Sequence, residues 1–218
     1  PGEVAVILGS KTGRDGIAGA SFASKELDET SESTLPNIQI GDPFEEKLLV
    51  ECCLDILEKG LITSMQDMGA AGILSSSSEV AQKSGCGIDI DVRLIPLRES
   101  DMEPWEIFLS ESQERMLLVV KEEHLDEIFA IANHYGLDCD AIGKLTDNLL
   151  YRVFKDDELL ANLPVDILGE TPVINWPSTV PSDLSSRQEL DVKSLESLSL
   201  KEDLLALLKD PNGYSKEK

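Results

Sequence analysis

The chain has 218 residues, a formal net charge of −23, 41% hydrophobic residues and only 5% aromatic residues, so it can bury a mainly aliphatic core. This charge argues against nucleic acid and anionic membranes as main partners, because the long-range field would repel both. The sequence contains no signal peptide and no run of about 18 apolar residues, and its four cysteines form no Cys-x-x-Cys pair, so we expect a cytoplasmic protein with free thiols.

The first part of the chain predicts a strand, a loop and a helix. Residues 4–8 form an uninterrupted apolar run, which is typical of a buried strand. The glycine-rich segment 9–16 follows as a loop, but it lacks the glycine-lysine-serine/threonine sequence of a P-loop. After a polar surface loop and a short strand over 24–40, Asp42 is expected to cap a helix over 43–59. The inward-facing apolar stripe of this helix should consist of Leu48, Leu49, Cys52, Cys53, Ile56 and Leu57.

The rest of the chain mixes strands with helices. We expect strands at 61–66, 87–92, 116–120, 140–145, 149–154 and 158–163, and helices at 73–83, 104–109, 122–135 and 164–168. This order of hairpins and crossovers predicts an α/β mixed (α+β) domain with a mixed sheet and helices on its faces. The domain should occupy residues 1–170, and 171–218 should be a linker or tail with a short helix near 201–208.

Asp67 lies in the most distinctive stretch of the sequence, residues 64–75. It ends a predicted strand and precedes a turn of glycine and alanine that leads into a helix. A carboxylate at such a junction is well placed to hold magnesium, and the N–H groups at the start of the helix favour an anion nearby. The residues therefore predict a magnesium–phosphate site. A tight strand–helix connection with an exposed Asp explains the local pattern equally well.

Two further polar clusters leave alternatives open. The serines at 75–78 are interpreted first as a small-residue face packed close to the sheet, and second as hydroxyl groups near a phosphate. Residues 110–115 are polar and come directly before an apolar strand, which is costly unless their groups find partners. They either cap the preceding helix and turn or face a ligand.

Four stretches, taken together and in order, resemble one family: residues 13–24, 39–47, 66–72 and 109–116. They are similar to the synthetase subunit of phosphoribosylformylglycinamidine synthase (FGAM synthase) of the small, multi-subunit type. The resemblance implies a fragment of a longer polypeptide, namely the C-terminal domain of the first of two homologous halves. It also implies a three-layer α/β/α fold like that of the aminoimidazole ribonucleotide synthetase C-terminal domain.

The resemblance implies an ATP-dependent ligase of purine biosynthesis. In this family, ATP activates the amide oxygen of formylglycinamide ribonucleotide (FGAR), and ammonia from a glutaminase subunit then displaces phosphate; a small accessory subunit completes the complex. Carried over by motif, Asp67 would bind Mg²⁺, Gln39 would contact FGAR, and Glu111, Ser112 and Gln113 would form a further part of that substrate site. The family's catalytic histidines, its ATP-holding lysine and most metal ligands lie outside these 218 residues, so we expect the isolated chain to be inactive.

Two alternatives belong to other classes. The chain could come from another ATP-dependent synthetase of the same superfamily, such as a selenophosphate synthetase or a hydrogenase maturation enzyme; the sequences at 39–44 and 111–115 argue against this. It could also be a non-catalytic interaction domain, against which the intact Gln39, Asp67 and Gln113 argue mildly.

Overall fold

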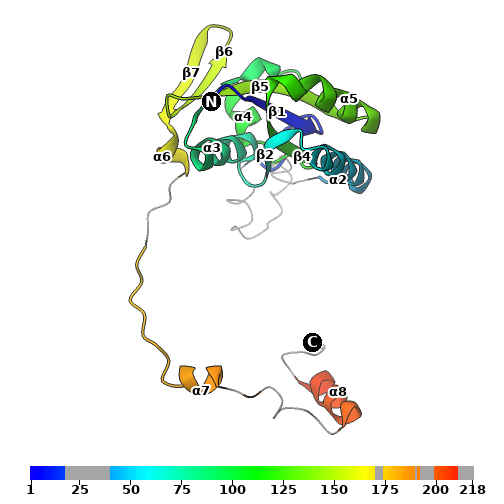
Figure 1. Ribbon diagram of the computed structural model, residues 1–218, viewed down its shortest axis with the longest axis vertical. Coiled ribbons are helices and arrows are strands. Elements are labelled where there is room, and N and C mark those ends of the chain that lie inside the picture. The colour runs from blue at the N-terminus through cyan, green and yellow to red at the C-terminus, as the bar shows by residue number, and fades with distance from the viewer. Residues whose placement is uncertain (18–39, 170–173, 190, 192–198, 211–218) are drawn as a thin grey trace, which may run out of the picture. The chain divides into compact units, whose positions relative to one another are not determined.

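The computed structural model describes residues 1–17, 40–169, 174–189, 191 and 199–210 (Figure 1). The chain divides into two units, Pro1–Thr171 and Pro172–Lys218. The first unit contains the sheet and its covering helices. The second contains α7 (Leu184–Gln188), which the sequence did not predict, and α8 (Leu200–Lys209), which confirms the short helix expected there.

Seven strands within the described residues form one mixed sheet in the order β2-β4-β1-β5-β3-β6-β7. They are β1 (Val4–Gly9), β2 (Ile62–Asp67), β3 (Gly87–Asp91), β4 (Arg115–Val120), β5 (Asp138–Thr146), β6 (Leu150–Lys155) and β7 (Glu158–Pro164). β3 pairs with β6 in parallel, whereas the other neighbouring strands in this part of the chain pair antiparallel. β1 lies inside the sheet, where Val4 pairs with both Val120 and Lys144.

Helices cover both faces of this sheet. They are α2 (Pro43–Glu58), α3 (Gly72–Ser84), α4 (Pro104–Leu109), α5 (Leu125–Tyr135) and α6 (Val165–Gly169). Successive side chains of β1 point to opposite faces, so Ile7 packs in the apolar cluster under α3, α4 and α6, while Val6 packs in the cluster under α2 and α5. The structure thus has the predicted three layers, helix, sheet and helix.

Helix α2 begins where the local sequence indicates. The Asp42 side chain accepts hydrogen bonds from the N–H groups of Phe44 (2.9 Å) and Glu45 (3.2 Å), which satisfies two donors at the helix start. One inward position was predicted wrongly: Leu57 is 46% exposed. At about 100° per residue, Leu57 lies beyond the arc of the helix that carries the buried residues Leu49, Cys52, Cys53 and Ile56.

Other expectations differ in detail. The predicted helix at 122–135 begins with a 3₁₀ turn over 122–124 and becomes α-helical from Leu125. The expected loop at 24–36 and most of the short strand at 37–40 lie outside the described residues, and Ile40 is not in a strand. The four cysteines, all within the described ranges, are free thiols, as predicted.

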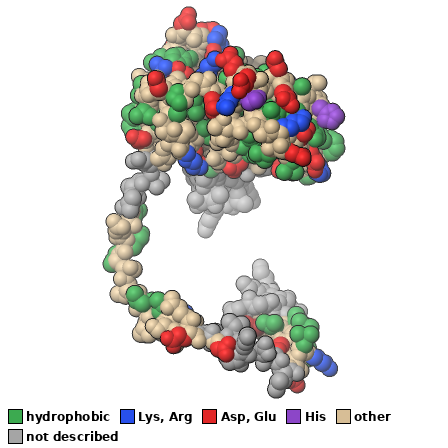
Figure 2. Space-filling view, in the orientation of Figure 1, with side chains coloured by type: hydrophobic (Ala, Val, Ile, Leu, Met, Phe, Trp, Pro, Cys, Tyr) green, Lys and Arg blue, Asp and Glu red, His purple; other side chains and the backbone are tan. Residues whose placement is uncertain are grey.

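The surface in Figure 2 carries many acidic side chains among fewer basic ones, in keeping with the net charge of −23. None of the helices in the described ranges is both long and apolar enough to cross a membrane.

Candidate functional site

Residues 110–115, called here the junction segment, run from the end of α4 to the first residue of β4 and contact the first glycine-rich loop. The Gly13 N–H donates a hydrogen bond to the Ser112 hydroxyl at 2.9 Å. The Glu111 N–H donates to the Asp15 carbonyl oxygen at 2.8 Å. Two of the four sequence motifs, separated by almost a hundred residues, are therefore bonded to each other.

The junction segment also contacts the other two motifs. The Ala71 N–H, just after the turn that follows Asp67, lies 3.3 Å from a carboxylate oxygen of Glu111. The Asp42 N–H, at the start of α2, donates to the Glu114 carboxylate at 2.9 Å. The described portions of all four motifs thus meet at one place in the fold.

Asp67 and Gln113 share a pocket at this place. Asp67 is the last residue of β2, and its carboxylate accepts a hydrogen bond from the Gln66 amide at 2.9 Å. The pocket has a volume of about 270 Å³ and is lined by Glu46, Leu49, Asp67, Met68, Gly69, Ala70, Gln113, Glu114, Arg115 and Met116. A predicted metal ligand and a predicted substrate contact therefore face one cavity.

The Asp67 carboxylate is suited to be one of the ligands of a magnesium ion. A carboxylate oxygen is a hard donor of the kind that Mg²⁺ prefers. In the described ranges, however, no three His, Cys, Asp or Glu side chains gather closely enough to hold a metal ion. Further ligands would have to come from substrate phosphates, water or other protein groups, which is common for Mg²⁺ in phosphate chemistry.

The start of α3, where the sequence predicted an anion, lies against a carboxylate of the chain itself. Glu111 is only 7% exposed and accepts from the Ala71 N–H. Gly72 has φ +43°, and a Cβ atom there would collide with the Ser110 carbonyl oxygen. This close approach holds the turn after Asp67 against the junction segment.

Arg115 is the residue that the sequence reasoning missed. It is 3% exposed, and its guanidinium donates three hydrogen bonds: from Nε to the Ser112 carbonyl (2.8 Å), from Nη1 to the Thr12 hydroxyl (2.8 Å) and from Nη2 to the Ser110 carbonyl (2.7 Å). Burial lowers the pKa of Arg115 to about 10, so it remains charged at neutral pH. The signal in the sequence was a charged residue placed directly before an apolar strand.

Asp15 supplies negative charge beside Arg115. It is 5% exposed, accepts from the Ser112 hydroxyl, and receives two contacts from Arg98 Nη2 at 2.8 and 2.9 Å. The predicted contact residue Ser112 is itself 2% exposed, so its hydroxyl is engaged inside this buried network.

The remaining predicted residues fall in three different situations. Gln113 is half-buried and donates from its amide to the Glu111 carbonyl at 2.7 Å. Gln39 lies outside the described residues. Within the serine run, Ser77 is fully buried and lies 2.8 Å from the Tyr151 hydroxyl, which favours the interpretation of these serines as a packed small-residue face.

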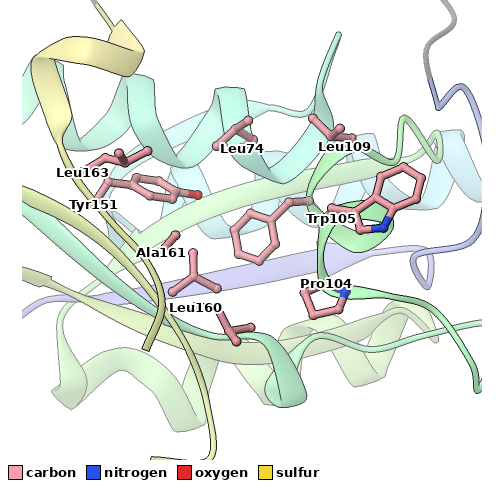
Figure 3. Close-up of a pocket in the computed structure, with 10 residues that line it drawn as sticks. Leu74, Pro104, Trp105, Leu109, Tyr151, Leu160, Ala161 and Leu163 are labelled. Carbon is pink, nitrogen blue, oxygen red and sulfur yellow. The ribbon is translucent and has the colours of Figure 1, made fainter. Parts of the chain in front are cut away.

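A second cavity, of about 310 Å³, is apolar and contains none of the predicted site residues (Figure 3). It lies between α3, α4 and the β6–β7 hairpin, and Trp105 stands at one side of it. Its lining consists of Leu74, Pro104, Trp105, Phe108, Leu109, Tyr151, Val153, Leu160, Ala161 and Leu163.

Known proteins that are similar in sequence to this chain identify its family. The model of the family described as AIR synthase related protein, C-terminal domain, matches residues 1–155. The chain belongs to this family. It is 46% identical, over 217 residues, to the phosphoribosylformylglycinamidine synthase subunit PurL of Aquifex aeolicus, covering 99% of this chain and 29% of that protein. The chain thus spans less than a third of this curated relative.

Solved structures of Thermotoga maritima PurL are similar as well, each aligned over 83% of this chain. The complex with FGAR is 43% identical with a TM-score of 0.72 and is covered to 31%. The complex with ATP is 39% identical with a TM-score of 0.67 and is covered to 28%. The Thermotoga PurLQS structure is 38% identical with a TM-score of 0.69 and is covered to 29%. These relatives confirm the resemblance that the four motifs indicated.

Proposed function

We propose that this chain acts as part of the synthetase subunit of FGAM synthase, an ATP-dependent ligase of purine biosynthesis in the cytoplasm. The observation that carries the proposal is the meeting of the four motifs at the junction segment, beside the pocket shared by Asp67 and Gln113. The similarity to PurL over nearly the whole chain supports it.

Within this site, Glu111, Ser112 and Gln113 are proposed to contact FGAR together with Gln39, and Asp67 is proposed to bind Mg²⁺. The pocket that holds Asp67 and Gln113 supports this division, because it brings a metal-binding carboxylate beside a side-chain amide. An amide can donate to and accept from a polar substrate. The complexes of Thermotoga PurL with FGAR and with ATP agree with these substrate classes.

The proposed reaction has two steps. The FGAR amide oxygen attacks the γ-phosphorus of ATP, which gives an iminophosphate and ADP. Ammonia then attacks the imidate carbon, and inorganic phosphate leaves as formylglycinamidine ribonucleotide forms. Magnesium, when bound, would offset phosphate charge that an acidic chain would otherwise repel. The residues of this chain would bind and orient FGAR, and Asp67 would hold the metal.

The rest of the machinery is proposed to come from outside these residues. A glutaminase subunit would supply ammonia and a small accessory subunit would complete the complex; the Thermotoga PurLQS structure supports such an assembly. Residues 1–170 would act as one domain, and 171–218 would lead to a second half. By itself the chain should show no turnover of ATP and ammonia.

The proposal is tested with Asp67→Asn in the whole native protein. The assay follows ammonia-dependent release of phosphate from ATP in the presence of FGAR across a series of magnesium concentrations. Asn keeps the shape of Asp67 but removes the charge of one metal ligand, so activity should fall at least about tenfold and recover in part at high magnesium. The matched control is Asp126→Asn, an exposed carboxylate on α5, which should behave as the parent.

If the Asp67→Asn variant were as active as the parent, Asp67 would be a structural turn residue, and the proposed metal site would be ruled out. A parent protein that binds neither FGAR nor nucleotide in the presence of magnesium would instead favour the interaction-domain alternative.

A further inference from the structure

Arg115 joins the junction segment to the glycine-rich loop through three hydrogen bonds. Its three hydrogen bonds end on two backbone carbonyls of the junction segment, those of Ser110 and Ser112, and on the hydroxyl of Thr12 in the glycine-rich loop. Because a guanidinium is planar and presents its donors in a fixed fork, these bonds fix the direction of the carbonyls and not only their distance.

The same guanidinium also lies against the turn that follows Asp67. A Cβ atom at Gly72 would come within 3.2 Å of Arg115 Nη2, besides colliding with the Ser110 carbonyl. Arg115 is also part of the lining of the pocket that contains Asp67 and Gln113. It therefore borders the proposed site and contacts two of its four motifs, together with Thr12 in the glycine-rich loop.

A contribution to stability does not by itself explain why a charged side chain is buried at position 115. An arginine that is 3% exposed loses most of its hydration, and hydrogen bonds of good geometry repay this loss only in part. A well-packed apolar side chain would serve the core at least as well. Keeping the arginine is understandable if the orientation of residues 111–113 depends on it.

We propose that Arg115 is a positioning residue for FGAR: by fixing the carbonyls of Ser110 and Ser112, it sets the orientation in which residues 111–113 meet the substrate. This inference rests on the proposed function. It assigns to Arg115 no contact with the reacting atoms.

Two substitutions test this in the whole native protein. Arg115→Lys keeps the charge but cannot reach three acceptors in the same fork. Thr12→Val keeps the shape of a fully buried side chain and removes only the hydroxyl that accepts from Nη1. Thr12→Ser restores that hydroxyl, and Arg152→Lys is the matched arginine control, since Arg152 pairs with Asp89 on strands away from the junction segment.

The Michaelis constant for FGAR should rise about tenfold in Arg115→Lys and about threefold in Thr12→Val, the effect of one or two ordinary hydrogen bonds. The Michaelis constant for ATP should change by less than about twofold, because residues 111–113 are proposed to contact FGAR. Thr12→Ser and Arg152→Lys should keep the parental constant for FGAR. A purely structural role would instead lower the melting temperature and leave both Michaelis constants unchanged.

If Arg115→Lys fails to fold, Thr12→Val decides the question. Parental FGAR constants in the folded variants, or equal increases for FGAR and ATP, would overturn the positioning role while the parent still turns over FGAR. A parent without FGAR-dependent cleavage of ATP would overturn the proposed function, and this inference with it.

Discussion

The backbone N–H of Asp42 lies 2.9 Å from a carboxylate oxygen of Glu114, and this hydrogen bond joins the start of α2 to the segment before β4. Glu114 has φ +55°, an unusual value for a residue with a side chain, and it lines the pocket beside Asp67. Burial is the main cause that raises the pKa of Glu114, and the carboxylates of Glu46 and Glu45 add to it.

Glu114→Gln should stabilise the protein at neutral pH. A raised pKa means that the folded state binds the proton more tightly than the unfolded state, so this group's contribution to stability is present at low pH and is lost as pH rises through the raised pKa. Gln keeps an oxygen acceptor for Asp42 without the charge. Urea unfolding should therefore give the variant a higher free energy of unfolding than the parent at pH 7.

The advantage of Glu114→Gln should shrink as pH falls and vanish below 4.5, the ordinary value for Glu. The other carboxylates titrate in both proteins, so their contributions cancel in the difference between the two free energies of unfolding. A variant less stable than the parent at pH 7 would contradict the assigned cost of the charge.

Gly72→Ala should be severely destabilising. The added Cβ would meet the backbone carbonyl of Ser110, which cannot move without disturbing the junction segment, and φ +43° disfavours any L side chain. We expect a loss of at least about 3 kcal/mol in the free energy of unfolding. Gly136→Ala is the control, because its φ of +73° carries similar strain while a Cβ there would have nothing within 4 Å; it should cost about 1–2 kcal/mol. Equal costs would show that the close approach at Gly72 is unimportant.

Ser77 and Tyr151 should be energetically coupled. Their hydroxyls lie 2.8 Å apart in the core, and burial raises the pKa of Tyr151. Ser77→Ala leaves a buried phenol without this partner, whereas Tyr151→Phe removes the phenol itself. A double-mutant cycle should give a coupling of about 1 kcal/mol in the free energy of unfolding.

The same variants separate the two interpretations of the serine run. If Ser77 is a packing residue, Ser77→Ala should leave the Michaelis constant for FGAR at its parental value. A large rise in that constant without a loss of stability would favour the phosphate interpretation.

The elements that the sequence predicted best are those governed by one or two local residues. The Asp42-Pro43 pair starts α2, glycines in the left-handed region end α3 and α5, and an uninterrupted apolar run makes β1. Leu57 was misassigned because helical periodicity fixes the apolar stripe but not its width, which depends on what packs against it.

The candidate site was predictable only in part, for a related reason. Asp67 and residues 111–113 stand out by composition and motif, whereas the role of Arg115 depends on carbonyl and hydroxyl groups that only the folded chain brings together. A buried arginine and an exposed one look alike in a sequence. The bonds among the motifs join residues far apart in the chain, and no local signal specifies them.

The interior position of β1 has a consequence for synthesis of the chain. Val4 is synthesised before both of its pairing partners, which are Val120 on one side and Lys144 on the other. At ordinary rates of translation, the nascent apolar strand has no partner for on the order of ten seconds. Folding of this sheet is therefore a late event with high contact order, and a chaperone that shields β1 until its partners are made would protect the nascent protein from aggregation.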